Sequence, residues 1–183
     1  ATLDVMSGGR LMLGVGVGVG IIEQELIAMG SSLADRGAMT DECIEILKVL
    51  WTQDDPVYQG RFHSFSGMKF SPKPAQKPHI PLLIGGTSKA AIRRAARVGD
   101  GWHPMAMPPE DLSMGIKYLE EQARLVGRDP AEMLQKAHTY ESLGVERMVI
   151  SSGTGDPQEM ASAMEMLARG DTGAAIVVKV DIA

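Results

Sequence analysis

Cysteine, aromatic residues and basic runs are all scarce in this chain of 183 residues. The single cysteine, Cys43, excludes an internal disulfide and a zinc cluster built on cysteines. No stretch approaches the roughly 18 apolar residues of a membrane span. No basic start followed by an apolar run marks a signal peptide. These absences predict a cytoplasmic protein without a membrane partner.

Positive charge is also in short supply. The 18 Lys and Arg residues are outnumbered by 23 Asp and Glu, and the formal net charge is -5. Such a balance argues against a nucleic-acid partner. The four histidines are scattered without metal-ligand spacing, so no metal is predicted. With 22% charged residues the composition is that of a globular chain, and we expect a single domain over residues 1–183.

The most informative stretch is residues 81–94, PLLIGGTSKAAIRR. Its apolar LLI run after proline predicts a buried strand of a parallel sheet. Gly85 and Gly86 allow a tight turn and a close approach of backbone to a ligand. Thr87 or Ser88 can then cap a helix whose first N–H groups attract an anion. The pattern predicts a phosphate site, and the alternative is an ordinary strand-to-helix turn that binds nothing.

A second glycine-rich stretch lies near the start of the chain. A predicted strand over 10–17 runs into an alternation of glycines with valines, followed by a predicted helix over 21–29. The glycines are Gly14, Gly16, Gly18 and Gly20. They would let the backbone come close to a planar ligand or a phosphate. The spacing is not the dinucleotide-binding fingerprint, and a flexible strand without a ligand is the alternative.

Helical periodicity and clustered aromatics organise residues 32–81. Ser32 and Asp35 resemble a capping box. The predicted apolar stripe behind them is Met39, Cys43, Ile46 or Leu47, and Leu50. On this stripe Cys43 is interpreted as a core residue, not a nucleophile. Residues 57–70 predict a hairpin that covers a pocket or joins a partner interface, and the prolines of 71–81 predict an extended connector.

The remainder alternates predicted helices and strands. Helices are predicted over 90–98, from Pro109 to Gly127, over 129–143 and over 156–170. Strands are predicted over 100–104, 146–151 and 174–182. The stripe of the Pro109 helix is Leu112, Ile116, Leu119, Ala123 and Val126. This alternation predicts a parallel α/β sheet whose strand ends carry any site.

Trp102 and His103 end one of these strands and are candidate contacts for a cofactor ring. His103 is the candidate catalytic residue, because an imidazole can hydrogen-bond or transfer a proton near neutral pH. The alternatives are that Trp102 only packs and that His103 only makes a structural hydrogen bond.

Four ordered segments together resemble the bacterial-luciferase-like family of flavin-dependent monooxygenases and deazaflavin-dependent oxidoreductases. They are SGGRLMLGVGVG, ADRGAMTDECIEILKVLW, FSPKPAQKPHIPLLIGGTS and AARVGDGWHP. The resemblance implies a TIM (β/α)8 barrel that binds FMN, or alternatively the deazaflavin coenzyme F420. It places phosphate contacts at Gly85, Gly86, Thr87 and Ser88, and close backbone approach near Gly14, Gly16 and Gly18.

The family resemblance also implies an oxidoreductase that performs monooxygenation or hydride transfer on a small organic substrate. A barrel takes about 250 residues. We therefore expect the chain to be the C-terminal part of a luciferase-like barrel, with an open sheet. A homo-oligomer, such as a dimer, is the expected assembly. A non-catalytic flavin-binding homologue and a purely structural assembly module are the two alternatives.

Overall fold

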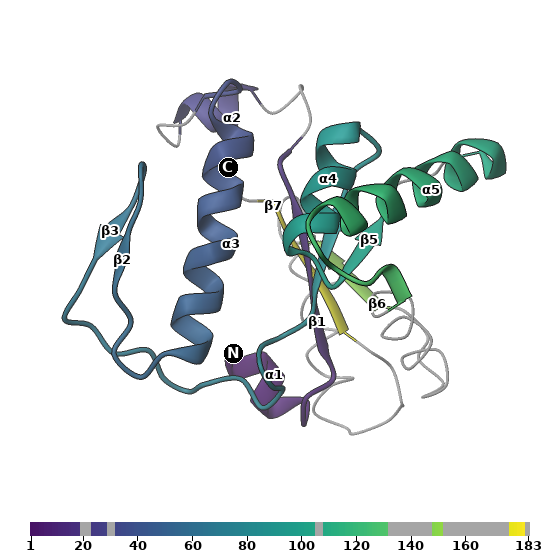
Figure 1. Cartoon of the computed structure of the whole chain (residues 1–183). Coiled ribbons are helices and arrows are strands. Elements are labelled where there is room, and N and C mark those ends of the chain that lie inside the picture. Colours follow the sequence, from purple (N-terminus) through teal and green to yellow (C-terminus); the bar gives the residue numbers. More distant parts are fainter. Residues whose placement is uncertain (19–22, 29–31, 105–107, 132–147, 152–175, 182–183) are drawn as a thin grey trace. The chain divides into compact units, whose positions relative to one another are not determined.

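The computed structural model describes residues 1–18, 23–28, 32–104, 108–131, 148–151 and 176–181 (Figure 1). Its contacts divide the chain into two compact units. The first unit is Ala1–Gly9, Gly16–Ile80 and Asp181–Ala183, and the second unit is Arg10–Val15 and Pro81–Val180. Within the described ranges, no helix has the length and apolar character to cross a membrane.

A five-stranded sheet is the centre of the fold, in the order β5-β4-β1-β7-β6. The strands are β1 (Leu11–Gly16), β4 (Leu82–Gly85), β5 (Gly101–His103), β6 (Met148–Ser151) and β7 (Ile176–Asp181). The pairs β1–β4, β4–β5 and β6–β7 are parallel. Read from β1 through β4 to β5, then from β6 through β7 back to β1, the strands follow chain order, as in a parallel barrel. The five predicted strands are confirmed.

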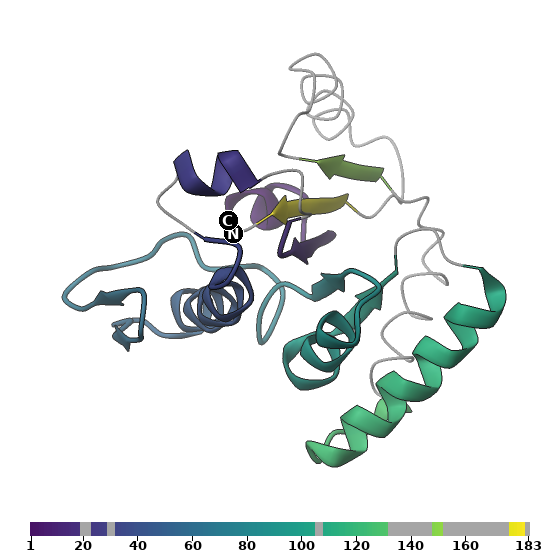
Figure 2. The same ribbon diagram turned by 90° about the horizontal axis from the view of Figure 1, so that it is seen from above.

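Two helices that contact each other lie next to β4 and β5, as Figures 1 and 2 show. They are α4 (Lys89–Val98) and α5 (Pro109–Leu125). Their contact is built on small residues, since buried Ala96 and Ala123 meet with Leu119 packed against them. Small side chains allow two helices to approach closely. The helix α5 is therefore held against α4, the helix that follows β4.

The predicted stripe of α5 is partly wrong. Ile116 and Val126 are exposed, and the buried positions are Gly115 and Ala123. The helix turns Gly115 inward because that position faces the ring of Trp102, where only a residue without a side chain fits. Apolar periodicity alone could not detect a glycine that takes part in packing.

Polar side chains from adjacent loops fix the ends of these elements. Arg128 Nη1 donates to the carbonyls of Ala95 (3.4 Å) and Ala96 (2.8 Å) in the last turn of α4. The Ala95 carbonyl also accepts the Gly99 N–H, and a cation at this end of α4 complements the helix dipole. Asp100 accepts a hydrogen bond from the Leu82 N–H at 3.0 Å and so anchors the start of β4. The predicted helices over 129–143 and 156–170 lie largely or wholly outside the described residues.

The first unit contains α1 (Thr2–Met6), α2 (Glu23–Ala28), α3 (Arg36–Thr52) and a hairpin of β2 (Tyr58–Gln59) with β3 (Ser64–Phe65). The hairpin was predicted, whereas α1 was not. The start of α3 follows the predicted Ser32–Asp35 pair, in which the Asp35 N–H donates to Ser32 Oγ at 3.1 Å. The connector over 71–81 contains cis peptide bonds before Pro72 and Pro78.

The buried positions of α3 differ from the predicted stripe. They are Thr40, Glu42, Ile44 and Trp51, whereas Met39, Cys43, Ile46, Leu47 and Leu50 are half-buried. Thr40 is buried without penalty because its hydroxyl donates to the Arg36 carbonyl at 2.7 Å. Burial raises the pKa of the Cys43 thiol, and the Glu42 charge adds to this. Cys43 is thus half-buried instead of lying in the core, and its raised pKa agrees with the interpretation that it is not a nucleophile.

One buried carboxylate holds the hairpin turn to α3. Glu42 accepts hydrogen bonds from the N–H groups of Arg61, Phe62 and His63 and from the His63 ring. Burial alone would raise the pKa of Glu42, but these hydrogen bonds together lower it. Nearby, burial and a 2.8 Å hydrogen bond to Glu45 raise the pKa of Tyr58 to about 12. The hairpin is therefore fixed mainly by charge-assisted hydrogen bonds.

Candidate functional site

The register of the second unit assigns each strand residue to one of two sheet faces. Partners across a parallel pair share a face, and neighbours along a strand alternate. One face carries large side chains and is turned toward the helices: Leu13, Val15, Leu82, Ile84 and Trp102. The opposite face carries Gly14, Leu83, Gly85, Gly101 and His103.

Glycine therefore dominates the face that α4 and α5 do not cover. The large apolar side chains that β1 and β4 place on this face are Met12 and Leu83, and Leu83 Cδ2 would lie 2.7 Å from a Cβ at Gly101. A Cβ at Gly85 would meet the Val15 carbonyl oxygen at 3.5 Å, an ordinary van der Waals distance. At the ends of β1, β4 and β5 this face therefore consists mainly of glycine backbone, and His103 adds one imidazole to it. A flat ligand can approach such a surface closely.

Gly86 forms the turn between β4 and α4, and its backbone is fixed on both sides. Its N–H donates to the His103 carbonyl at 3.3 Å, and its own carbonyl accepts from Trp102 Nε1 at 2.7 Å. Its φ is +114°, a region that side chains disfavour. A Cβ there would also lie 3.1 Å from the Cβ of Ala91. Glycine is required at this turn.

The predicted cap of α4 is confirmed at Ser88. Its hydroxyl oxygen accepts from the Ala91 N–H at 3.2 Å. Thr87 and Lys89, on either side of it, are exposed. The N–H groups of Lys89 and Ala90 belong to the first helical turn and have no partner within the helix. The turn thus presents backbone donors, two hydroxyls and the positive end of a helix dipole at one place.

The remaining predicted site residues are placed as follows. Gly14 and Gly16 are buried in β1, and Gly18 follows that strand with φ +72°. Gly16 and Gly18 belong to the first unit, whereas the turn belongs to the second. The structure brings together Gly85, Gly86, Ser88, Trp102 and His103, and the roles of all these residues toward a ligand stay predictions.

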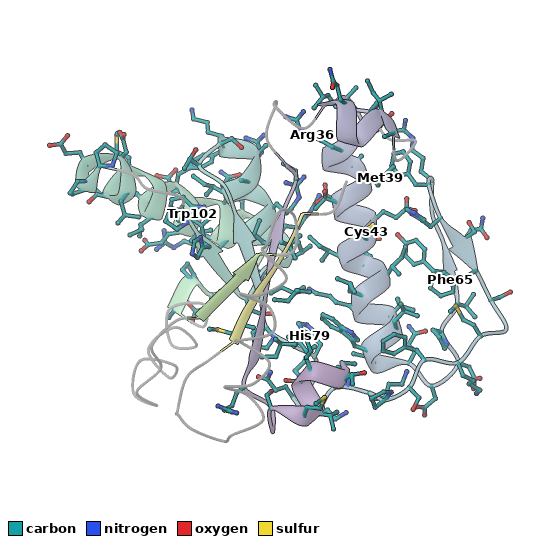
Figure 3. All side chains as sticks on the ribbon, turned by 180° about the vertical axis from the view of Figure 1, so that it is seen from behind. Arg36, Met39, Cys43, Phe65, His79 and Trp102 are labelled. Carbon is teal, nitrogen blue, oxygen red and sulfur yellow. The ribbon has the colours of Figure 1, made fainter. Side chains whose placement is uncertain are left out.

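Trp102 lies on the helix-facing side of β5, beside Ile84, and is labelled in Figure 3. Its ring contacts the position of Gly115 in α5, where a Cβ would be 2.4 Å from the ring. Gly115 was not among the predicted site residues. An isolated glycine inside a helical pattern was the available signal, because such a residue usually has a packing reason.

Comparison with known proteins decides the family. Residues 1–140 match the family model described as luciferase-like monooxygenase. The chain belongs to this family. The resemblance seen in the sequence is thereby confirmed. The matched residues include the whole turn, β5 and α5.

Three relatives show the range of the family. An uncharacterised Mycobacterium tuberculosis protein is 33% identical over 180 residues, which cover 92% of this chain and 62% of the relative. The FMNH2-dependent dimethylsulfone monooxygenase of Pseudomonas putida is 32% identical, covering 93% of this chain and 44% of that protein. The F420-dependent glucose-6-phosphate dehydrogenase of Microbacterium testaceum is 34% identical, covering 56% and 30%. The chain thus spans less than two thirds of the length of these relatives.

A solved structure agrees with the fold. The monooxygenase RslO1 from Streptomyces bottropensis matches with a TM-score of 0.59 and 25% identity, covering 96% of this chain and 52% of that one. The predicted fold class, a luciferase-like (β/α) barrel that is partial over these residues, is confirmed.

Proposed function

We propose that the protein is an oxidoreductase that holds FMN, or alternatively the deazaflavin F420, at the Gly85–Ser88 turn and acts on a small organic substrate. The observation that carries this proposal is the construction of Gly86. Its backbone is fixed by hydrogen bonds on both sides, its φ is positive, and it lies two residues before Ser88, the N-cap of α4. A turn built in this way places backbone donors where a phosphate group would bind.

The residues of the turn fit a phosphate group. The exposed Thr87 hydroxyl is a further donor, while Ser88 keeps its oxygen on the Ala91 N–H and can still donate its proton. The glycine-dominated face of β4 and β5 would lie against a planar ring. Gly14, on the same face of β1, is proposed to add a backbone contact to it, and the contacts expected at Gly16 and Gly18 stay predictions.

His103 is the proposed catalytic residue. It lies at the end of β5 on the same face as Gly85, directly across from it. Barrel enzymes place functional side chains at this end of their strands. The imidazole would hydrogen-bond the reacting part of the ring or substrate and move a proton there. The cofactor itself supplies hydride transfer or oxygen chemistry when bound. The relatives named above include one enzyme of each cofactor type, which supports both alternatives.

Binding of FMN and of F420, each followed by fluorescence titration, tests the proposal. Gly86→Val should weaken binding of the preferred cofactor at least tenfold, because the new side chain strains a positive φ and meets Ala91. Gly127→Val is the matched control, since Gly127 also has a positive φ (+72°) but nothing lies within 4 Å of its Cβ position. Equal affinity in the two variants, or no binding of either cofactor to the parent protein, would overturn the proposed site.

A further inference from the structure

The indole of Trp102 connects three elements that are distant in sequence. It extends from β5, donates its N–H to the carbonyl of Gly86 between β4 and α4, and places its six-membered ring against Gly115 of α5. All three residues lie in the second unit.

The contact with Gly115 leaves no room for any side chain. A Cβ at Gly115 would lie 2.4 Å from Cη2 and 2.9 Å from Cζ3 of the ring. Contacts this short do not occur, so either the ring or the helix must move. The helix is held by Ala96 against Ala123 and by Arg128 at the end of α4, whereas the ring can rotate about its own side-chain bonds. Rotation of the ring would break the 2.7 Å hydrogen bond to Gly86.

We propose that Trp102 and Gly115 are positioning residues that set the conformation of the cofactor turn. Trp102 holds the Gly86 carbonyl, and Gly115 determines where Trp102 can lie. The role of Trp102 is thus to orient the Gly86 peptide and with it the following N–H groups, instead of stacking on a cofactor ring. This proposal rests on the proposed function of the turn.

The substitution Gly115→Ala separates this role from simple stability. Alanine is a better helix former than glycine, so helix propensity alone predicts a more stable protein with unchanged binding. The positioning role predicts instead that Gly115→Ala weakens cofactor binding. Loss of one hydrogen bond corresponds to about threefold to tenfold weaker affinity for FMN or F420, whichever the parent protein binds.

A double-mutant cycle with Trp102→Phe tests whether Gly115 acts through the indole. Phenylalanine has no N–H donor and lacks the outer ring atoms that reach Gly115. We expect Trp102→Phe to weaken cofactor binding by a similar factor, and we expect Gly115→Ala to have no further effect in that background. Additive losses in the double variant would overturn the proposal, as would unchanged affinity in Gly115→Ala.

A readout without cofactor separates failure of this inference from failure of the proposed function. Amide exchange of residues 84–91, measured without ligand, should become faster in Gly115→Ala and in Trp102→Phe, because the turn loses its fixed carbonyl. Met114→Ala, at the exposed neighbour of Gly115 in α5, is the control and should leave that exchange unchanged. If the parent protein binds neither cofactor but the exchange rates change as expected, the proposed function fails and the positioning role stands. Exchange rates that equal those of the parent protein overturn the positioning role.

Discussion

Ser88 and Thr87 are adjacent hydroxyl residues with different surroundings. Ser88 caps α4 through the Ala91 N–H, whereas Thr87 is exposed in the turn. Ser88→Ala should therefore destabilise the protein by about 0.5–2 kcal/mol, the range for lost N-caps. Thr87→Ala should leave the unfolding free energy unchanged and weaken cofactor binding by roughly 1 kcal/mol.

Denaturant unfolding and cofactor titration of both variants check this pair. The informative result is the crossed pattern, in which one variant changes mainly stability and the other only affinity. If Thr87→Ala binds as tightly as the parent protein, its hydroxyl does not contact the phosphate.

His103 gives a second prediction at the scale of the residue. Its backbone carbonyl already serves the turn by accepting from the Gly86 N–H, so the substitution His103→Ala leaves that contact in place. The variant should lower turnover by about 10²–10⁴, the usual contribution of a positioned acid or base, while cofactor affinity changes little. Steady-state kinetics with any substrate that the unsubstituted protein turns over, together with a thermal melt, is the measurement. A fall in melting temperature with nearly full turnover would show that the imidazole is structural.

At the scale of elements, the β2–β3 hairpin depends on one carboxylate. Glu42→Gln keeps the size of the side chain but turns an amide group toward a cluster of N–H donors. The resulting loss of hydrogen bonds should lower the melting temperature by several degrees. Glu45→Gln is the control, because Glu45 is exposed and meets only the Tyr58 hydroxyl in the described hydrogen bonds. Equal melting temperatures for the two variants would argue against Glu42 as the main attachment.

The same carboxylate predicts an acid dependence of stability. The folded-state pKa of Glu42 lies below its ordinary value of 4.5, so the unfolded chain binds the proton more readily. The contribution of Glu42 is complete above about pH 4.5 and is lost as the pH falls through the lowered pKa. Urea unfolding between neutral and acid pH should show a steeper loss for the parent protein than for Glu42→Gln. Parallel curves for the two proteins would contradict this assignment.

Short sequence patterns predicted helices, strands and turns well where one local physical cause dominates. The glycines after β4, the serine cap of α4 and the closing Gly99 each act within a few residues, so their patterns located the turn and the helix. The stripe of α3 was wrong because Glu42 is buried by a hairpin that follows it by many residues. Gly115 was missed for the same reason, since its partner Trp102 lies in another element.

At the scale of the whole molecule, the sequence predicted the class of sheet but not the order of its strands. Alternating strands and helices predict a parallel sheet, but the neighbours of β1 are β4 and β7, which differ from it greatly in sequence position. Such pairing depends on how helices pack across the sheet, which local patterns do not contain. The barrel was predicted from the family resemblance, which rests on four segments in one order along the chain and which the family model confirms.

The division into two units gives a final prediction, about where a ligand acts. Amides that exchange through local openings are slowed by a ligand only near its binding site. Excess FMN or F420, whichever binds, should slow exchange in residues 82–91 and 101–103 of the second unit. Exchange of the hairpin over 57–66 in the first unit is followed in the same experiment, because Glu42 holds that hairpin without any ligand. Mass spectrometry of peptic fragments, with and without cofactor, measures both. Slowing at 11–18 would support the roles predicted for Gly14, Gly16 and Gly18, whereas slowing at 57–66 without any at 82–91 would place the ligand away from the Gly86 turn.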